Sequence, residues 1–324
     1  MIPASKQAGA ALLSILLIVA TLSVAALMAT SAIARQTELQ KLGSRRTSSN
    51  WAARSAEAAV LSSAADLVGA SGLPATGDGA ARVQTMALPL DGGQVVVTVR
   101  ELGPCFNLNA LATEDEAIRV RTVSAFSVLL EDIGVPDAEA ASLTDTLIDW
   151  MDADAVQRPL GAEDSTFLMR MDGFRAANQP LKGAGELAAL PGFTPELRAA
   201  LAGHTCILPE TEPMRLNVNA LTFDSAAILR AATLGALSPA EARRFVEARP
   251  AAGWRSVQDV NDDLSSRPAV QQAMAGIPIS VQGAYFEAEG DIQLDAGSWP
   301  FRFLLSAEGG KTPKVVWRSF GGAG

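Results

Sequence analysis

Residues 10–34 read AALLSILLIVATLSVAALMATSAIA and contain no charged side chain. At about 1.5 Å rise per residue, a helix over this stretch is longer than the ~30 Å hydrocarbon core of a bilayer. The residues before it carry a single charge, at Lys6. The stretch therefore predicts one transmembrane helix, which embeds in membrane lipid and tethers the rest of the chain.

A secretory signal peptide is the main alternative for this N-terminus. Lys6 would provide its basic start, and Ala32-Ile33-Ala34 has the small-x-small pattern of a cleavage site. However, the apolar core of a signal peptide runs to about 7–15 residues. The length of the uncharged run favours the membrane anchor.

Composition limits what the remainder can be. The chain has 324 residues, of which 48% are hydrophobic, and this length favours about two domains. Its formal net charge is −9. No nucleic-acid partner is expected, because such binding needs a basic surface to displace counterions from phosphate.

The cysteines indicate one bridge at most. Cys105 and Cys206 are too few for a disulfide scaffold, and both lie beyond the predicted anchor. In an oxidising compartment we favour a single disulfide between them over two free thiols.

Two kinds of periodicity divide the soluble part. Residues 35–67 continue at helical density, whereas 94–101, 285–294, 299–306 and 314–320 alternate as β-strands. We predict an α+β fold in which residues 35–104 and 279–324 form one domain, with the long N-terminal helix packed on a small antiparallel sheet. Residues 105–278 are then a large all-α insertion that needs its own core.

The insertion contains recurring helix signals. Asn107-Leu-Asn-Ala-Leu111 is repeated as Asn217-Val-Asn-Ala-Leu221, and each Asn is suited to cap the helix that follows. Leu190-Pro-Gly192 and Gly253-Trp254 each lie between two short helical patterns. These segments predict units that resemble a helix-hairpin-helix.

Carboxylates are densest after the predicted helix 137–151. Oxygen-rich loops of this kind suit Ca²⁺, which takes six to eight oxygen ligands. The spacing is not that of an EF-hand, because Val156 and Gln157 stand where a ligand and a glycine are required. A solvated acidic loop is the alternative to a calcium site formed by Asp149, Asp152, Asp154, Glu163 and Asp164.

Signatures of enzymes are missing from the sequence. His204 is the only histidine, and Gly310-Lys311-Thr312 lacks the first glycine of a phosphate-binding loop, since Leu305 stands there. We therefore expect no catalytic site. A membrane-anchored hydrolase of an unrecognised type is the minor alternative.

Several strings of the sequence resemble those of a known family. The leader resembles that of type IV pilin-like proteins, and the later strings are similar to the K-type minor pseudopilin of type II secretion systems. These strings are KQAG at 6–9, LIDWMDAD at 147–154, GAED at 161–164, EL at 186–187, LPG at 190–192 and NVNA at 217–220.

The resemblance implies how the N-terminus is processed. Residues 1–9 would be a leader that a prepilin peptidase removes by cutting between Gly9 and Ala10, after which Ala10 is N-methylated, leaving 10–34 as the transmembrane helix. Ser14 occupies the fifth mature position, where most pilin-like proteins carry Glu and where the K-type family commonly lacks it.

The resemblance also implies a function. The chain would be a single-pass protein of the bacterial inner membrane with a pilin-like soluble part in the periplasm. It would form the tip of the pseudopilus with the I-type and J-type minor pseudopilins and support export of folded proteins across the outer membrane. The family further implies structural calcium in the inserted domain.

A DNA-uptake protein is the functional alternative. The segments around 190–192 and 217–259 also resemble the helix-hairpin-helix units of membrane-anchored DNA receptors. The first turn is followed by Phe193-Thr-Pro-Glu196 and has no basic residue before Arg198. This acidic context disfavours phosphate binding.

Overall fold

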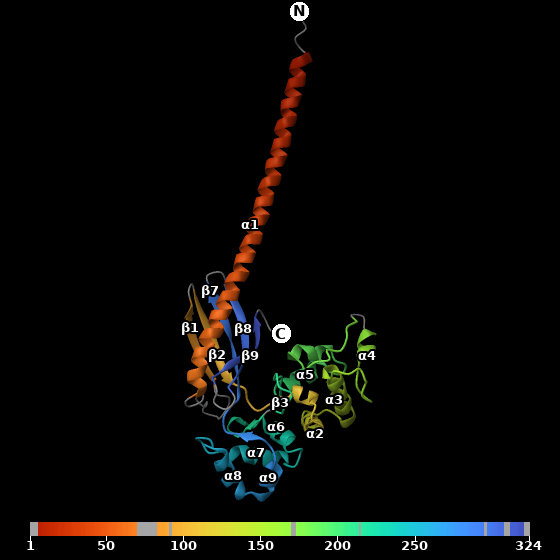
Figure 1. Ribbon diagram of the computed structural model, residues 1–324, viewed down its shortest axis with the longest axis vertical. Helices are drawn as coiled ribbons and strands as arrows, with labels where there is room; N and C mark the ends of the chain where they lie inside the picture. The colour runs from red at the N-terminus through yellow and green to blue at the C-terminus, as the bar shows by residue number, and fades with distance from the viewer. Residues whose placement is uncertain are drawn as a thin grey trace, which may run out of the picture.

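The molecule consists of a long helix, a sheet packed on its far half, and a helical block beyond the sheet (Figure 1). The structure is a computed structural model that describes residues 6–69, 83–90, 93–169, 173–213, 215–294, 297–307 and 312–320. Residues 1–5 of the predicted leader lie outside it, and around Gly9 and Ala10 only the helical backbone is described.

Helix α1 runs without interruption from Lys6 to Gly69. Ile15–Gln40 has a mean hydropathy of 2.2, and none of it is buried within the protein. The far half differs, because Ala52, Ala53, Ala56 and Val60 recur at helical spacing and are buried against the sheet. One helix therefore has an apolar half with no protein cover and a half that packs on the sheet.

Five of the described strands form an antiparallel sheet in the order β1-β2-β7-β8-β9. Val95, Val97 and Val99 alternate toward α1, as a strand with one buried face requires. The predicted strands are confirmed, but β1 was not predicted, because Pro89 weakens the β pattern. The bounds are β1 Val83–Leu90, β2 Gly93–Glu101, β7 Tyr285–Leu294, β8 Gly297–Ser306 and β9 Lys314–Phe320.

The helical block lies between two neighbouring strands of this sheet. Glu101 at the end of β2 pairs with Phe286 in β7, so the chain leaves and re-enters the sheet at one place. The predicted α+β architecture is confirmed in this respect. The division into separate domains stays a prediction.

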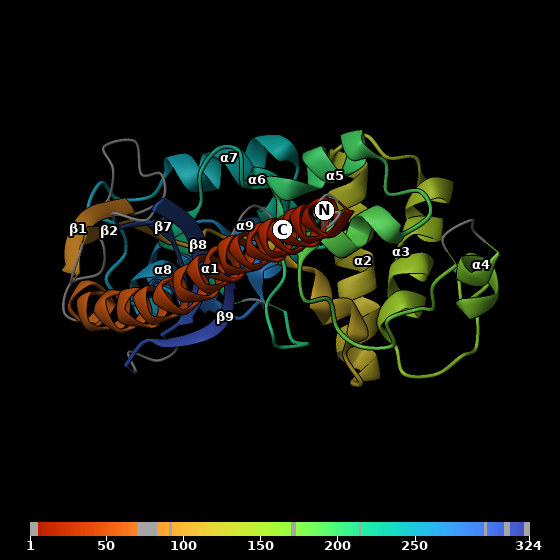
Figure 2. The ribbon, with the colours of Figure 1, turned by 90° about the horizontal axis from the view of Figure 1, so that it is seen from above.

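The block consists of two successive units. The first contains β3 Phe106–Asn107, η1 Leu108–Ala112, α2 Glu116–Asp132, α3 Asp137–Met151, α4 Asp164–Leu168, η2 Ala184–Ala189, α5 Pro195–Ala202 and β4 Thr205–Cys206. The second contains β5 Leu216–Asn217, η3 Val218–Ala220, α6 Ala226–Ala232, α7 Pro239–Glu247, α8 Val257–Ser265, α9 Pro268–Met274 and β6 Ile279–Ser280. Figure 2 shows the first unit displaced sideways from the sheet.

Each unit begins and ends with a short strand, and these two strands pair in parallel. Asn107 is in register with Cys206, and Asn217 with Ser280. The predicted helical insertion therefore also contains short strands that the sequence did not predict. Two-residue strands are too short to leave an alternating pattern in the sequence.

The repeated asparagines hold the start of each unit. Asn107 and Asn217 accept a hydrogen bond from the N–H two residues further on, at 3.2 and 3.1 Å, which confirms their predicted capping role. Asn109 is fully buried and donates to the carbonyl oxygens of Leu181 and Leu208. In the second unit the equivalent bonds run from Asn219 to the carbonyl oxygens of Trp254 and Val281.

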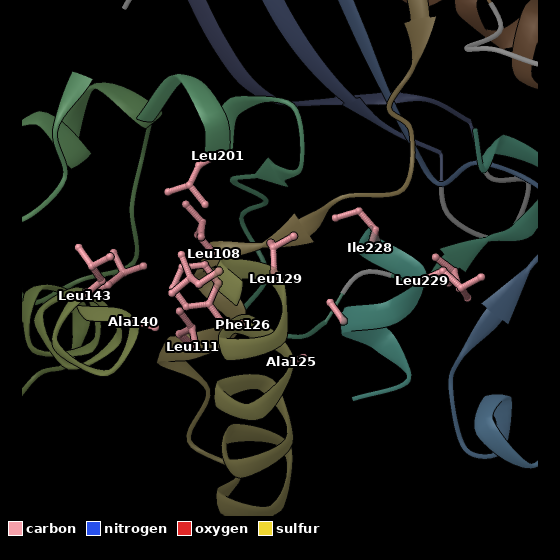
Figure 3. Close-up of a cluster of buried hydrophobic side chains, with 14 of the residues drawn as sticks. Leu108, Leu111, Ala125, Phe126, Leu129, Ala140, Leu143, Leu201, Ile228 and Leu229 are labelled. Carbon is pink, nitrogen blue, oxygen red and sulfur yellow. The ribbon is translucent and has the colours of Figure 1, made fainter. Parts of the chain in front are cut away.

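The helix-hairpin-helix-like units are also confirmed. Gly192 lies between η2 and α5 at φ +82°, and Gly253 lies between α7 and α8 at φ +70°. Both backbones are in the left-handed region, which glycine adopts at least cost. A single apolar core fills the block, and Figure 3 shows Leu108, Phe126 and Leu129 converging in it.

We predict that Gly290→Ala destabilises the sheet. A Cβ at this position would lie 2.0 Å from the carbonyl oxygen of Val96, so the backbone of β2 or β7 must shift. Overpacking of this kind costs about 1–3 kcal/mol. Urea denaturation of the full chain in lipid nanodiscs should reveal the loss as a lower midpoint.

Gly103→Ala is the matched control, since nothing lies within 4 Å of its Cβ position. Its midpoint should stay near that of the parent chain. Equal destabilisation by the two variants would contradict the packing argument.

Candidate metal centre

Three carboxylates converge between the end of α3 and the start of α4. Figure 1 shows α4 at the outer edge of the first unit. Oxygen atoms of Asp152, Asp154 and Glu163 all lie within 4.8 Å of one another. Asp152 follows the last residue of α3, and Glu163 is the N-cap of α4. Two helix ends therefore bring these groups together.

Two oxygen atoms of this cluster are buried without a partner among the residues that the structure describes. Oδ1 of Asp152 and Oε1 of Glu163 accept no hydrogen bond from any of those residues. Leaving a buried acceptor unsatisfied costs about 1–3 kcal/mol, and more when it is charged. A cation bound here would offset that cost. In a solvated acidic loop, by contrast, water would satisfy these oxygen atoms and the cost would not arise.

The pKa values agree with a desolvated anionic site. Burial, with smaller contributions from the carboxylates of Asp154 and Glu163, raises the pKa of Asp152 to about 6. The pKa of Asp149 is also raised to about 6, first by burial, although the backbone N–H of Arg158 opposes the shift. A cation bound close to these carboxyl groups would favour their ionised form and lower both pKa values.

Asp149 has a different place from the three converging groups. It is fully buried, and the N–H of Arg158 donates to its two oxygens at 3.3 and 3.1 Å. Gly161 packs so closely that a Cβ there would lie 2.1 Å from Oδ2 of Asp149. Asp149 thus folds the loop back onto α3.

Asp164 is likewise occupied by other groups. The guanidinium of Arg175 donates to Oδ2 at 2.7 Å, and the N–H of Ala176 donates to Oδ1 at 2.9 Å. Of the five predicted ligands, the structure brings together Asp152, Asp154 and Glu163, and it gives the other two to neighbouring donors.

Residues that sequence reasoning missed support the loop. Asp145 pairs with Nε of Arg158 at 2.8 Å and accepts from the N–H of Leu160. Behind it, Trp150 packs edge-on against Phe167, which holds α4 on α3. The i, i+4 spacing of Asp145 and Asp149 places both carboxylates on one face of the helix, and this spacing could have identified Asp145 from the sequence.

The chemistry of this donor set suits a hard cation. All its converging ligands are carboxylate oxygens, which favour Ca²⁺ or Mg²⁺ over metals that prefer nitrogen or sulfur. Ca²⁺ tolerates irregular geometry better than Mg²⁺, which demands a near-ideal octahedron.

The first unit is also closed by a disulfide. Cys105 and Cys206 are bonded, with Cα atoms 5.7 Å apart, beside the parallel pair β3 and β4. The bridge joins the start and the end of the unit across 101 residues. In the chain-entropy model, a disulfide stabilises the folded state more when it closes a longer loop, because it removes more conformational entropy from the unfolded chain.

Comparison with known proteins covers both units. Two family models described as type II secretion system (T2SS), protein K, match residues 104–210 and 216–281. The gap between them falls between β4 and β5, where the first unit ends and the second begins.

Similar proteins extend over nearly the whole chain. The type II secretion system protein K of Aeromonas hydrophila is 33% identical over 87% of this chain and 88% of its own length. The type II secretion system protein K of Klebsiella pneumoniae is 32% identical over 98% of this chain and 97% of its own length. The crystal structure of the GspK-GspI-GspJ complex from enterotoxigenic Escherichia coli contains a chain with a TM-score of 0.68 and 28% identity, covering 88% of this chain and 99% of that one.

Proposed function

This chain belongs to the protein K family of type II secretion systems, and we propose that it is the minor pseudopilin at the tip of the periplasmic pseudopilus. The similarity to protein K over almost its full length carries this proposal. The family is a structural component of a secretion machine, so we propose no catalytic role. Its work would be to support the export of folded proteins across the outer membrane.

The anchor half of α1 supports a position in the inner membrane. Ile15–Gln40 is long and apolar enough to span a bilayer, and none of the described residues buries it. The soluble part would then lie in the periplasm. The Cys105–Cys206 disulfide is consistent with that oxidising compartment.

The shape of the molecule supports a position at the tip. The helical block lies beyond the sheet, at the end of the molecule away from the N-terminus of α1 (Figure 1). In a filament whose helices run along its axis, another subunit stacked above would meet this block. A block of this size on every protomer would also clash at close axial spacing.

Ser14 is consistent with the same position. In pilin-like filaments, as the family implies, a Glu at the fifth mature position neutralises the N-terminal amine of a neighbouring subunit. A carboxylate without that partner would be costly in the apolar filament core, because desolvating an unpaired charge takes several kcal/mol. Ser14 avoids this cost in a subunit that has no neighbour above it.

The partners follow from the related complex. The similar Escherichia coli chain was solved in a GspK-GspI-GspJ complex, so we propose the corresponding I-type and J-type minor pseudopilins as partners here. A prepilin peptidase would act earlier, at Gly9 and Ala10. The comparisons do not support the DNA-uptake alternative, and the formal charge of −9 opposes it.

We further propose that the carboxylate cluster holds a structural calcium ion through Asp152, Asp154 and Glu163. The unpartnered oxygens of Asp152 and Glu163 support this proposal. When bound, the ion would supply the positive charge that the cluster lacks. Asp149 and Arg158 would hold the loop in its folded conformation.

We expect a tag in the helical block to mark one end of each pseudopilus. A peptide epitope inserted after Ala251, in an exposed turn, should be labelled by gold at a single filament end. Electron microscopy of overexpressed pseudopili provides the measurement. Gold distributed along the shaft would rule out the tip position.

The mature chain should begin at Ala10 and carry an N-methyl group. A charged leader on α1 would otherwise have to enter the apolar filament core, where an unpaired charge is costly. Intact-mass analysis of the protein extracted from membranes measures this directly. A chain that begins after Ala34 would instead support the signal-peptide alternative.

Calcium should stabilise the protein, and EDTA should lower its melting temperature. A ligand that binds only the folded state adds about 2.7 kcal/mol at a hundredfold excess over Kd. Asp154→Asn should abolish most of the EDTA effect. Asp164→Asn is the control, because Asp164 is bonded to Arg175 and Ala176, and it should preserve the effect.

Acid should weaken the same site. Without metal, the raised pKa of Asp152 keeps its carboxyl protonated below about pH 6. Calcium must displace that proton, so affinity should fall about tenfold per pH unit below 6 for each proton released. Calcium titrations between pH 5 and 7.5 test this, and a flat profile would contradict it.

A further inference from the structure

A cavity of about 90 Å³ lies at the seam between the two units of the helical block. Its walls come from α2, α6 and the segments that flank β3 and β5. Figure 3 shows Ala125 of α2 and Ile228 of α6 in the space between these helices, and both residues line the cavity. The cavity is far from the carboxylate cluster in the sequence and shares no residue with it.

The interior of the cavity is apolar. Small side chains leave it open, since Ala125, Ala231 and Ala232 stand where the two helices face each other. A cavity of roughly 150 Å³ lined by aliphatic groups accepts benzene. The space here thus suits one aliphatic side chain about the size of leucine, and it is too small for a long acyl chain.

Two arginines that also line the cavity give it a positive charge. Arg121 and Arg215 are exposed, and neither forms a salt bridge within the described part of the chain. Nη2 of Arg121 donates to the carbonyl oxygen of Ala232 at 3.0 Å, which fixes its guanidinium beside the cavity. Two such cations in a chain with a formal charge of −9 favour a carboxylate, which a guanidinium binds with paired hydrogen bonds.

We propose that this cavity binds the carboxy-terminal residue of a partner polypeptide. The terminal aliphatic side chain would fill the apolar interior, and the α-carboxylate would pair with Arg121 and Arg215. An apolar cavity beside two guanidinium groups requires a ligand whose apolar group and anion are only a few bonds apart. The carboxy-terminal residue of a polypeptide meets this requirement. The small volume of the cavity favours a polypeptide terminus over a fatty acid as the source of the carboxylate. The inference does not depend on the tip position.

The test uses N-trifluoroacetyl-L-leucine, whose fluorine signal reports binding by NMR, with the full chain in lipid nanodiscs. We expect line broadening that saturates with protein concentration. The corresponding leucine amide lacks the carboxylate and should bind at least fivefold more weakly. Empty nanodiscs correct for partition of either compound into lipid.

Variants of this chain separate the two parts of the site. Arg121→Gln with Arg215→Gln should weaken the acid at least fivefold and leave the amide unchanged. Ala232→Leu should reduce binding of both compounds by filling the cavity. Arg243→Gln is the control, because Arg243 is an exposed cation on α7 that does not line the cavity, and it should bind like the parent chain.

Three results would overturn the proposal. The first is no saturable broadening by the acid at millimolar concentration. The second is equal affinity for the acid and the amide. The third is displacement of the probe by octanoate at lower concentration than by N-acetyl-L-leucine, which would indicate a site for free fatty acids. If Ala232→Leu fails to fold, the arginine variants still test the site, because undiminished binding of the acid by Arg121→Gln with Arg215→Gln would also overturn the proposal.

Discussion

The antiparallel pairing of β2 with β7 is the contact on which the rest of the structure depends. It joins residues 93–101 to 286–294 and turns the valines of β2 toward α1. Because the two strands are antiparallel neighbours, the chain between Glu101 and Phe286 must leave and return at one end of the sheet. This constraint allows a large helical block to grow beyond the sheet while the face that packs on α1 stays intact.

Polar contacts hold the place where the chain leaves and re-enters the sheet. The side chain of Asn217 donates to the buried carboxylate of Glu101, which links the start of the second unit to the end of β2. Gly283 packs against the same carboxylate, because a Cβ there would lie 2.5 Å from Oε1 of Glu101. Buried carboxylates are stable only when such donors surround them. These contacts set how the helical block meets the sheet.

Within the block, one local design is used twice. Each unit closes its ends by a short parallel strand pair and ties its interior to a buried or half-buried asparagine, Asn109 or Asn219. An asparagine side chain offers both a donor and an acceptor, so it can satisfy backbone groups from segments far apart in the chain. The first unit adds the disulfide and the carboxylate cluster, and the cavity opens where the two units meet.

The sequence by itself determined the elements whose pattern is local. The uncharged run of α1, the alternating strands β2, β7, β8 and β9, and the capping asparagines follow from periodicity and hydrogen-bonding chemistry within a few residues. The acidic residues of the sequence also pointed to the loop in which Asp152, Asp154 and Glu163 converge. Only the tertiary structure decided which of them converge, because the loop folds so that Arg158 donates to Asp149, and Arg175 and the Ala176 backbone donate to Asp164. The cavity beside Arg121 and Arg215 was likewise absent from any local pattern, since its walls come from segments that only packing brings together.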